Sequence, residues 1–162
     1  MAAQLHIRPA TAEDAALLRT LIRELAEFEQ ELQNVSITTE DLLRDGFGPN
    51  PKFRALIAEF EGQVAGYALF FTVYSTWRGP QLFLEDLFVR PQFRGQGIGK
   101  QVLAFLARLA RRENCHAMRW EVLGWNQRAI DLYQSLGADF LDRWRIVLLQ
   151  DEALERLAGK AL

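Results

Sequence analysis

The sequence predicts a mixed α/β (α+β-like) fold, in which a central mixed and mostly antiparallel sheet carries helices on both faces. Three observations support this prediction. Apolar segments with strand and helix spacing alternate along the chain, an early hairpin is followed by strands that alternate with helices, and a glycine-rich turn, "RGQGIGK" at residues 94–100, joins an apolar segment to an amphipathic one. The length of 162 residues favours a single domain spanning residues 1–162.

The first third of the chain predicts one strand and two helices. The strand covers residues 4–9 and stops at Pro9, and the first helix covers residues 11–29, with Thr11 and Asp14 as a variant of the capping box. The second helix covers residues 38–48 and ends in glycines. The first helix carries one apolar stripe, made by Ala15, Leu18, Leu21, Ile22, Leu25 and Phe28.

The middle of the chain predicts a hairpin and a further strand. Residues 53–60 and 64–74 are apolar segments joined by the short polar turn "EGQ". A loop at 74–81 follows, and then the strand "LFLEDLFV" at 82–89, which Pro91 keeps from continuing.

The last third predicts helices that alternate with single strands. A helix covers residues 99–112, a strand 118–123, and a helix 126–137, with Asn126 as its cap and Gly137 as its stop. A last strand is expected at 144–149, "WRIVLL", and a short helix or tail at 151–162.

Composition narrows the class of protein. A net charge of −2 gives no electrostatic reason to expect nucleic acid or an anionic membrane as partner. The chain turns polar directly after its start and has no apolar run of roughly 18 residues, so we expect neither a signal peptide nor a membrane span. The single Cys115 suits a reducing, cytoplasmic location. Because Cys115, His6 and His116 lack metal-ligand spacing, no metal site is expected.

The glycine-rich turn indicates an anion site. Glycine allows close approach and positive φ, and the first N–H groups of the following helix lack helical partners, so phosphate oxygens suit them. A plain tight turn would look the same. The Walker pattern fails because Arg94 replaces its first glycine and Gln101 its Ser or Thr, and the dinucleotide pattern fails in register. The pattern that fits is Arg94-x-x-Gly97-x-Gly99.

This pattern resembles the acetyl-CoA pyrophosphate loop of the GCN5-related N-acetyltransferases (GNATs). In the same order as in that family's spermidine/spermine branch, the chain contains "IRPATAED", "LIRELAEFE", "DLLRDGFG", "LFLEDLFV", "FRGQGIGK" and "WNQRAIDLYQSLGA". The last of these, with the closing "RLAGK", is most similar to the diamine and thialysine acetyltransferases of the branch.

The resemblance implies a GNAT fold whose sheet splays open at a cleft for acetyl-CoA. The pantetheine arm is expected along the strand before the loop, and the diphosphate on the loop itself. A second helix is expected to complete the site. The cofactor residues implied are Leu87, Phe88, Val89, Arg94, Gly95, Gln96, Gly97, Ile98, Gly99, Lys100, Asn126, Ala129 and Tyr133.

Tyr133 is the expected general acid. Asn126 and Tyr133 are seven residues apart, which is two helical turns, so their side chains share a face. A phenol with a pKa of about 10 can protonate a departing thiolate whose own pKa is about 8.5. From the helix pattern alone, the favoured interpretation of Tyr133 is a core residue with its hydroxyl at the surface, and the resemblance reverses that preference in favour of the acid role.

Carboxylates are the expected amine-binding groups. Alternation along a strand would send Glu85 and Asp86 to opposite faces, so only one would face the cleft. The resemblance points to Glu85 for substrate contact and as a possible general base. It implies the substrate residues Phe28, Glu29, Glu85, Asp86, Arg119, Trp120 and Glu121, and a homodimer as the assembly.

Two departures from the family narrow the expected substrate. Ser75 stands where the polyamine enzymes carry an acidic residue, and the segment "DRWR" at 142–145 is two residues shorter than the corresponding family segment. Fewer cleft carboxylates favour a small amine, such as a thialysine- or lysine-like amino acid, over spermine. Acetylation of a protein N-terminus or lysine, and a non-catalytic acyl-CoA-binding module, are the alternatives. A covalent route through Cys115 is not expected, because no activating base is evident.

Overall fold

The computed structural model describes residues 4–160, which form two compact units that divide between Leu123 and Gly124. The first unit holds the strands β1–β5 and the helices α1–α3, and the second holds α4 and α5. Across the described residues, no helix is long and apolar enough to cross a bilayer.

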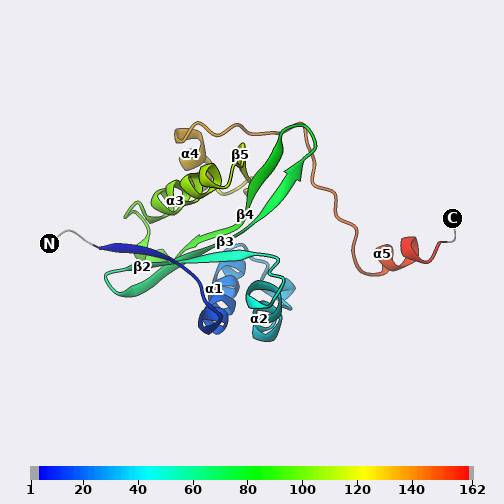
Figure 1. Ribbon diagram of the computed structural model, residues 1–162, viewed down its shortest axis with the longest axis horizontal. Coiled ribbons are helices and arrows are strands. Elements are labelled where there is room, and N and C mark those ends of the chain that lie inside the picture. The colour runs from blue at the N-terminus through cyan, green and yellow to red at the C-terminus, as the bar shows by residue number, and fades with distance from the viewer. Residues whose placement is uncertain (1–3, 161–162) are drawn as a thin grey trace. The chain divides into compact units, whose positions relative to one another are not determined.

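The first unit is built on one five-stranded sheet (Figure 1). Neighbouring strands in the sequence are also neighbours in the sheet, and the first three pairings are antiparallel, whereas β4 pairs with β5 in parallel. This confirms the predicted mixed and mostly antiparallel sheet. The strands are β1 (Leu5–Pro9), β2 (Arg54–Phe60), β3 (Gln63–Ser75), β4 (Gly79–Val89) and β5 (Ala117–Trp120).

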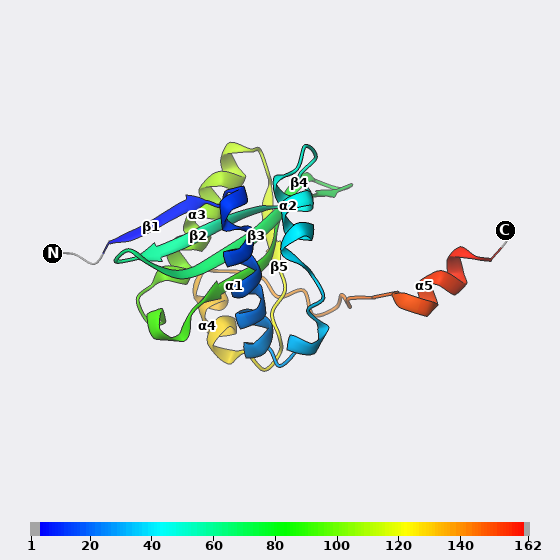
Figure 2. The same cartoon turned by 90° about the horizontal axis from the view of Figure 1, so that it is seen from below.

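Helices cover both faces of this sheet, as predicted. Figures 1 and 2 show α1 (Ala15–Phe28) and α2 (Thr39–Phe47) on one face and α3 (Ile98–Arg112) on the other. The core beneath α1 and α2 is made by Ala15, Leu18, Leu21, Leu42, Ala55, Ile57, Tyr67, Leu69 and Phe88. Helix α3 buries Ile98, Val102, Leu103, Leu106 and Ala110. The alternating strand residues thus serve two apolar layers.

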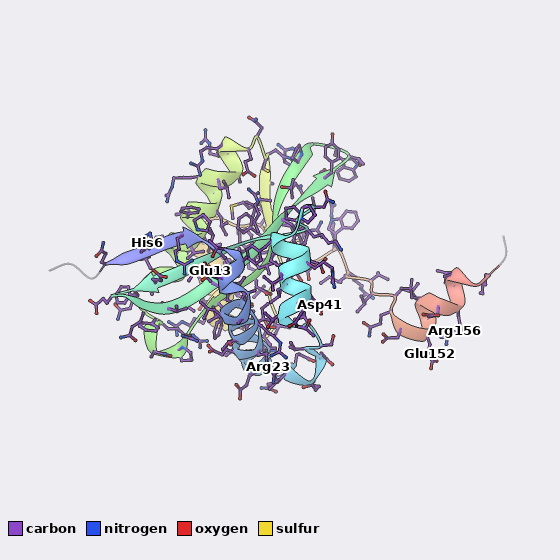
Figure 3. All side chains as sticks on the ribbon, turned by 60° about the horizontal axis from the view of Figure 1, so that its bottom comes forward. His6, Glu13, Arg23, Asp41, Glu152 and Arg156 are labelled. Carbon is purple, nitrogen blue, oxygen red and sulfur yellow. The ribbon has the colours of Figure 1, made fainter. Side chains whose placement is uncertain are left out.

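The second unit contains α4 (Gln127–Ser135) and α5 (Asp151–Ala158). Both predicted end signals of α4 are present: the Asn126 side chain accepts a hydrogen bond from the Ala129 N–H at 3.3 Å, and Gly137 adopts φ +79°. Glu152 and Arg156, labelled in Figure 3, form an i,i+4 pair at 3.3 Å on α5.

The predicted last strand at 144–149 is wrong. Residues 138–150 contain no helix or strand, and the side chains of Trp144, Ile146, Val147 and Leu148 are exposed. The β-branched, apolar composition predicted a strand, but a strand needs a partner for its backbone groups, and the described part of the chain does not supply one here.

Smaller differences concern strand ends. The hairpin of β3 and β4 is longer than predicted, so the loop at 74–81 shrinks to residues 76–78. Strand β5 ends at Trp120 rather than at Leu123. The first helix begins with a 3₁₀ turn at Ala12–Asp14 before α1.

The start of α1 is tied to the sheet by a buried ion pair. The Arg8 guanidinium donates to both oxygens of Asp14, at 2.8 and 3.0 Å, and to Glu59 at 2.9 Å. The Thr11 N–H donates to Asp14 at 2.8 Å, as the predicted capping box requires. The hydrogen bonds from Arg8 are the largest influence on the Asp14 pKa, which falls from its ordinary 3.8 to about 2.

Asp14→Asn is therefore expected to lower the free energy of unfolding at pH 7 by about 2 kcal/mol. A depressed pKa contributes stability above the unfolded-state pKa that disappears as the pH falls through the folded-state value. The difference in free energy of unfolding between the wild type and the variant should thus decrease below pH 4 and nearly vanish at about pH 2. Urea unfolding across this range measures it. Glu13→Gln, at a neighbouring exposed position (Figure 3), is the matched control and should unfold like the wild type. A difference in free energy of unfolding that does not change with pH would contradict the stabilising role of the Arg8–Asp14 ion pair.

Candidate active site

The glycine-rich loop connects β4 to α3 through left-handed backbone. Gly95 has φ +84° and Gly97 has φ +74°, in the region that residues with a Cβ rarely adopt. Gly97 caps α3, and the Ile98 side chain, 2% exposed, anchors the first helical turn in the core. Two of the three glycines are therefore required by backbone geometry.

The loop presents backbone N–H groups. The first helical hydrogen bond runs from the Gln101 N–H to the Gly97 carbonyl at 3.1 Å, so the amides just before Gln101 have no intrahelical acceptor. Gly95, Gln96, Gly97 and Lys100 are exposed. With the positive end of the helix dipole behind them, these amides suit the oxygens of a diphosphate.

Arg94 has a structural task at this loop. Its Nε donates to the Val89 carbonyl at 2.9 Å, and its guanidinium lies over the rings of Phe28, at 4.6 Å, and Phe88, at 5.9 Å. Arg94 thereby links the end of β4 to the end of α1. A phosphate contact from its side chain stays a prediction.

Strand β4 loses its neighbour on one side. Its parallel pairing with β5 runs from Gln81 to Leu84 and ends there, opposite Trp120, while its pairing with β3 continues to Val89. The backbone of residues 85–89 consequently has no strand partner toward β5 within the described residues. This is the predicted splay, and it leaves the N–H and C=O groups of Leu87 and the N–H of Val89 able to pair with an amide-bearing ligand arm.

A β-bulge lies at Glu85, at the start of this unpaired stretch. Leu69 pairs with Asp86 but Phe70 pairs with Leu84, so Glu85 is the extra residue. The assumption of simple alternation, which placed Glu85 and Asp86 on opposite faces, is therefore wrong here. Asp86 lies across from Leu69, on the side of the sheet that α1 and α2 cover.

Four carboxylates gather around this bulge; we call Glu29, Glu85, Asp86 and Glu121 the acidic cluster. Burial raises the pKa of Asp86, and a hydrogen bond from Tyr67 partly offsets this rise. Burial and the Asp86 charge raise the pKa of Glu29 and of Glu85, and Glu121 adds to the effect at Glu85. The cluster brings together carboxylates from the end of α1, from β4 and from beyond β5.

Within the described residues of the first unit, no ion pair joins a cation to the acidic cluster. The ion pairs of residues 4–160 involve other carboxylates. No group of three His, Cys, Asp or Glu side chains in that range is arranged to hold a metal ion. The cluster is thus an anionic site suited to an ammonium group.

The other predicted substrate residues in the first unit differ in position. Arg119 pairs with Phe83 across β4 and β5, and its guanidinium lies over the Phe83 ring at 5.8 Å. The Phe28 ring lies under the Arg94 guanidinium. Trp120 is the last residue of β5 and is partly buried. Glu121 contributes to the raised pKa of Glu85.

In the second unit, Asn126, Ala129 and Tyr133 lie along α4 and its cap. Tyr133 is 8% exposed, and burial raises the pKa of its phenol, so the hydroxyl carries its proton at neutral pH. Asn126 uses its side-chain oxygen to cap the helix. Their contacts with a cofactor stay predictions.

Sequence reasoning missed Tyr67 on β3. Its hydroxyl donates to Asp86 Oδ2 at 2.7 Å, and its side chain is 1% exposed. Within "VAGYALFF" it looked like one more core residue. The available signal was that a buried tyrosine hydroxyl needs a partner, and the adjacent strand of the hairpin offers the carboxylates of "LED".

Cys115 lies away from this site. It precedes β5, and the His116 N–H donates to the Pro80 carbonyl near the other end of β4. Burial raises the pKa of the Cys115 thiol, with a further contribution from Glu113, which opposes formation of a thiolate nucleophile.

Comparison with known proteins identifies the family. Residues 16–138 match the acetyltransferase (GNAT) family. The chain belongs to the GNAT family and is an N-acetyltransferase.

The similarity to individual relatives extends along nearly the whole chain. It is 42% identical to the thialysine N-epsilon-acetyltransferase of Mus musculus, over 98% of this chain and 99% of that protein. It is 41% identical to the spermidine/spermine N(1)-acetyltransferase-like protein 1 of Homo sapiens, over 82% of this chain and 20% of that protein. The fold is similar to that of the aminoglycoside N-acetyltransferase AAC(6')-Iy in complex with CoA, with a TM-score of 0.72 and 22% identity over 94% of this chain and 97% of that one.

Gly97→Ala is expected to weaken CoA binding about tenfold, because a Cβ at φ +74° costs about 1–2 kcal/mol, and a loop that moves to relieve this strain no longer presents its amides to the diphosphate. Calorimetric titration with CoA measures the dissociation constant. Gly62→Ala, at φ +78° in the β2–β3 turn, is the matched control. It should lose similar stability but keep the CoA affinity of the wild type. Equal CoA affinity in both variants would contradict the loop assignment.

Proposed function

We propose that the protein transfers an acetyl group from acetyl-CoA to a primary amine of a small diamine, polyamine, or thialysine- or lysine-like amino acid. The observation that carries the proposal is the acidic cluster, which lies without a paired cation at the start of the unpaired stretch of β4. An anionic site beside a strand edge that can hold a pantetheine arm suits a cationic acceptor. The likeness to thialysine acetyltransferase supports the choice of amine.

The residues of the loop and of β4 fit acetyl-CoA. The amides of residues 95–100 would hold the diphosphate, and the N–H and C=O of Leu87 and the N–H of Val89 would pair with the pantetheine amides. Bound there, acetyl-CoA supplies an activated acyl group as a thioester. Asn126 and Ala129 are proposed to complete the cofactor site from α4.

The chemistry is proposed as direct attack in a ternary complex. Glu85, whose pKa is raised by burial and by its acidic neighbours, accepts a proton from the acceptor ammonium, directly or through water. The neutral nitrogen forms a bond to the acyl carbon as the carbon–sulfur bond breaks, and it gives up its surplus proton, through water, to the phenolate that Tyr133 leaves. The Tyr133 phenol gives its proton to the departing sulfur, and its raised pKa keeps that proton available.

A panel of acceptors tests the proposed substrate class. Thiol release should be at least about tenfold more efficient with thialysine than with spermine, because Ser75 and the "DRWR" segment leave fewer carboxylates for a multiply charged amine. Lysine, short diamines and a peptide amine complete the panel. A spermine preference over thialysine would contradict the substrate choice, and activity on the peptide alone would contradict the small-amine proposal.

Tyr133→Phe tests the catalytic role within the same assay. Loss of a general acid is expected to lower kcat about 100- to 1,000-fold while the CoA dissociation constant is unchanged. Tyr74→Phe, at an exposed position, is the matched control and should behave as the wild type. Wild-type turnover in the Tyr133 variant would exclude the acid role.

We also propose a homodimer, as the resemblance implies. It is supported by the exposed apolar run Ile146–Leu149, because contiguous apolar surface of this kind usually marks an interface. Light scattering should give the mass of two chains. The double change Ile146→Asp and Leu148→Asp should reduce it to one, whereas the control Gln150→Asp, also exposed, should leave it unchanged. A monomeric wild type would refute the dimer.

A further inference from the structure

Tyr67 places a single hydroxyl against the deepest carboxylate of the acidic cluster. Its ring packs edge-on against Phe88, with centroids 6.5 Å apart, in the core beneath α1 and α2. From this fixed position the hydroxyl donates to Asp86 Oδ2 at 2.7 Å. Within residues 4–160, this is the one hydrogen bond to the Asp86 side chain, and Oδ1 is not sealed from solvent.

Outside the acidic cluster, the fold pairs buried and half-buried carboxylates with arginine. Asp14 receives two hydrogen bonds from Arg8, and Glu24 receives two from Arg90, at 2.7 and 2.8 Å. In the described part of the first unit, Asp86 has no such cation, although the carboxylates of Glu29 and Glu85 interact with it. Tyr67 supplies a neutral hydrogen-bond donor instead, which binds one oxygen of Asp86 and does not neutralise the carboxylate charge.

We propose that Tyr67 is a positioning residue for the acceptor amine, which holds Asp86 by one oxygen so that the other oxygen binds a substrate ammonium group. This inference rests on the proposed function, because it assigns the acidic cluster to a cationic acceptor. Tyr67 itself does not touch the substrate. It acts through Asp86, which the bulge at Glu85 brings beside the expected base.

The hydroxyl also favours the ionised form of Asp86. The groups that act on this site are Glu29 and Glu31 at the end of α1, Glu85 on β4, Glu121 beyond β5, and Tyr67 on β3. Each of these carboxylates, when ionised, disfavours the ionised form of its neighbours through like-charge repulsion. The hydrogen bond from Tyr67 alone lowers the pKa of Asp86 against its burial, so removing the hydroxyl raises that pKa.

The first test measures Asp86 directly and requires no turnover. In Tyr67→Phe, the Asp86 pKa followed by carboxyl ¹³C NMR is expected to rise by about one pH unit, because hydrogen bonds to charged groups are among the strong ones. The phenyl ring preserves the core packing, and Tyr74→Phe is the matched loss of an exposed hydroxyl. An unchanged Asp86 pKa in Tyr67→Phe would overturn the proposal.

The second test follows kcat/KM for thialysine against pH. Asp86 must be ionised to bind ammonium, so a raised Asp86 pKa should move the acid limb of the profile upward by about one pH unit. A purely structural effect would lower the whole profile without moving this limb. A limb that stays in place would therefore refute the positioning role.

A double-mutant cycle tests whether Tyr67 acts through Asp86. Asp86→Asn removes the charge and should lower kcat/KM at least about tenfold for thialysine. Adding Tyr67→Phe to Asp86→Asn should then change kcat/KM less than about twofold. If the two residues acted independently, the losses in kcat/KM of the two single variants would multiply. Multiplicative losses would overturn the proposal.

The outcomes separate this inference from the proposed function. If the wild type acetylates no amine but the Asp86 pKa rises in Tyr67→Phe, the hydrogen bond holds Asp86 as described and the amine assignment of the cluster fails. If the wild type acetylates thialysine but neither the pKa nor the acid limb moves, the proposed function stands and the role of Tyr67 fails.

Discussion

The parallel pairing of β4 with β5 ends after four residues, and the site depends on that ending. Beyond Leu84 and Trp120 the two strands no longer share hydrogen bonds, while β3 continues to hold β4 as far as Val89. Strand β4 is thus rigid on one side and open on the other. Backbone groups left without a partner in a sheet must be satisfied by solvent or by a ligand, so the open edge is a preformed template for an amide-bearing arm. The glycine-rich loop follows this edge directly, which aligns the strand edge with the amides at the start of α3.

The bulge at Glu85 connects this backbone feature to the chemistry. An extra residue at the point where pairing ends redirects the side chains, so that Glu85 and Asp86 interact instead of facing apart. Placing several carboxylates together without a cation raises the free energy of the empty site, and the raised pKa values of Glu29, Glu85 and Asp86 express that cost. The same neighbours that destabilise these carboxylates make one of them a better base and give the site its affinity for a cation.

Motifs and helices could be predicted from the sequence, whereas strand-end geometry could not. Helical periodicity and capping residues are local, so α1, α2, α3 and α4 were predicted within a few residues, and so was the glycine-rich turn. The bulge depends on how β4 pairs with β3, which no local pattern in "LFLEDLFV" reveals. Tyr67 was missed for a related reason, because its partner Asp86 is on another strand. The predicted strand at 144–149 has the right composition, but it lacks a strand to pair with in the described chain.

The sequence alone determined the fold class, the order of most elements, the family and the identities of the carboxylates, because periodicity, caps and ordered motifs are written in neighbouring residues. The tertiary structure decided which carboxylates meet, which of them lacks a cation, and where β4 loses its partner. Those properties depend on distances between residues far apart in the chain. A hydrogen bond of 2.7 Å between Tyr67 and Asp86, 19 residues apart in sequence, exists only once two strands have paired in one particular register.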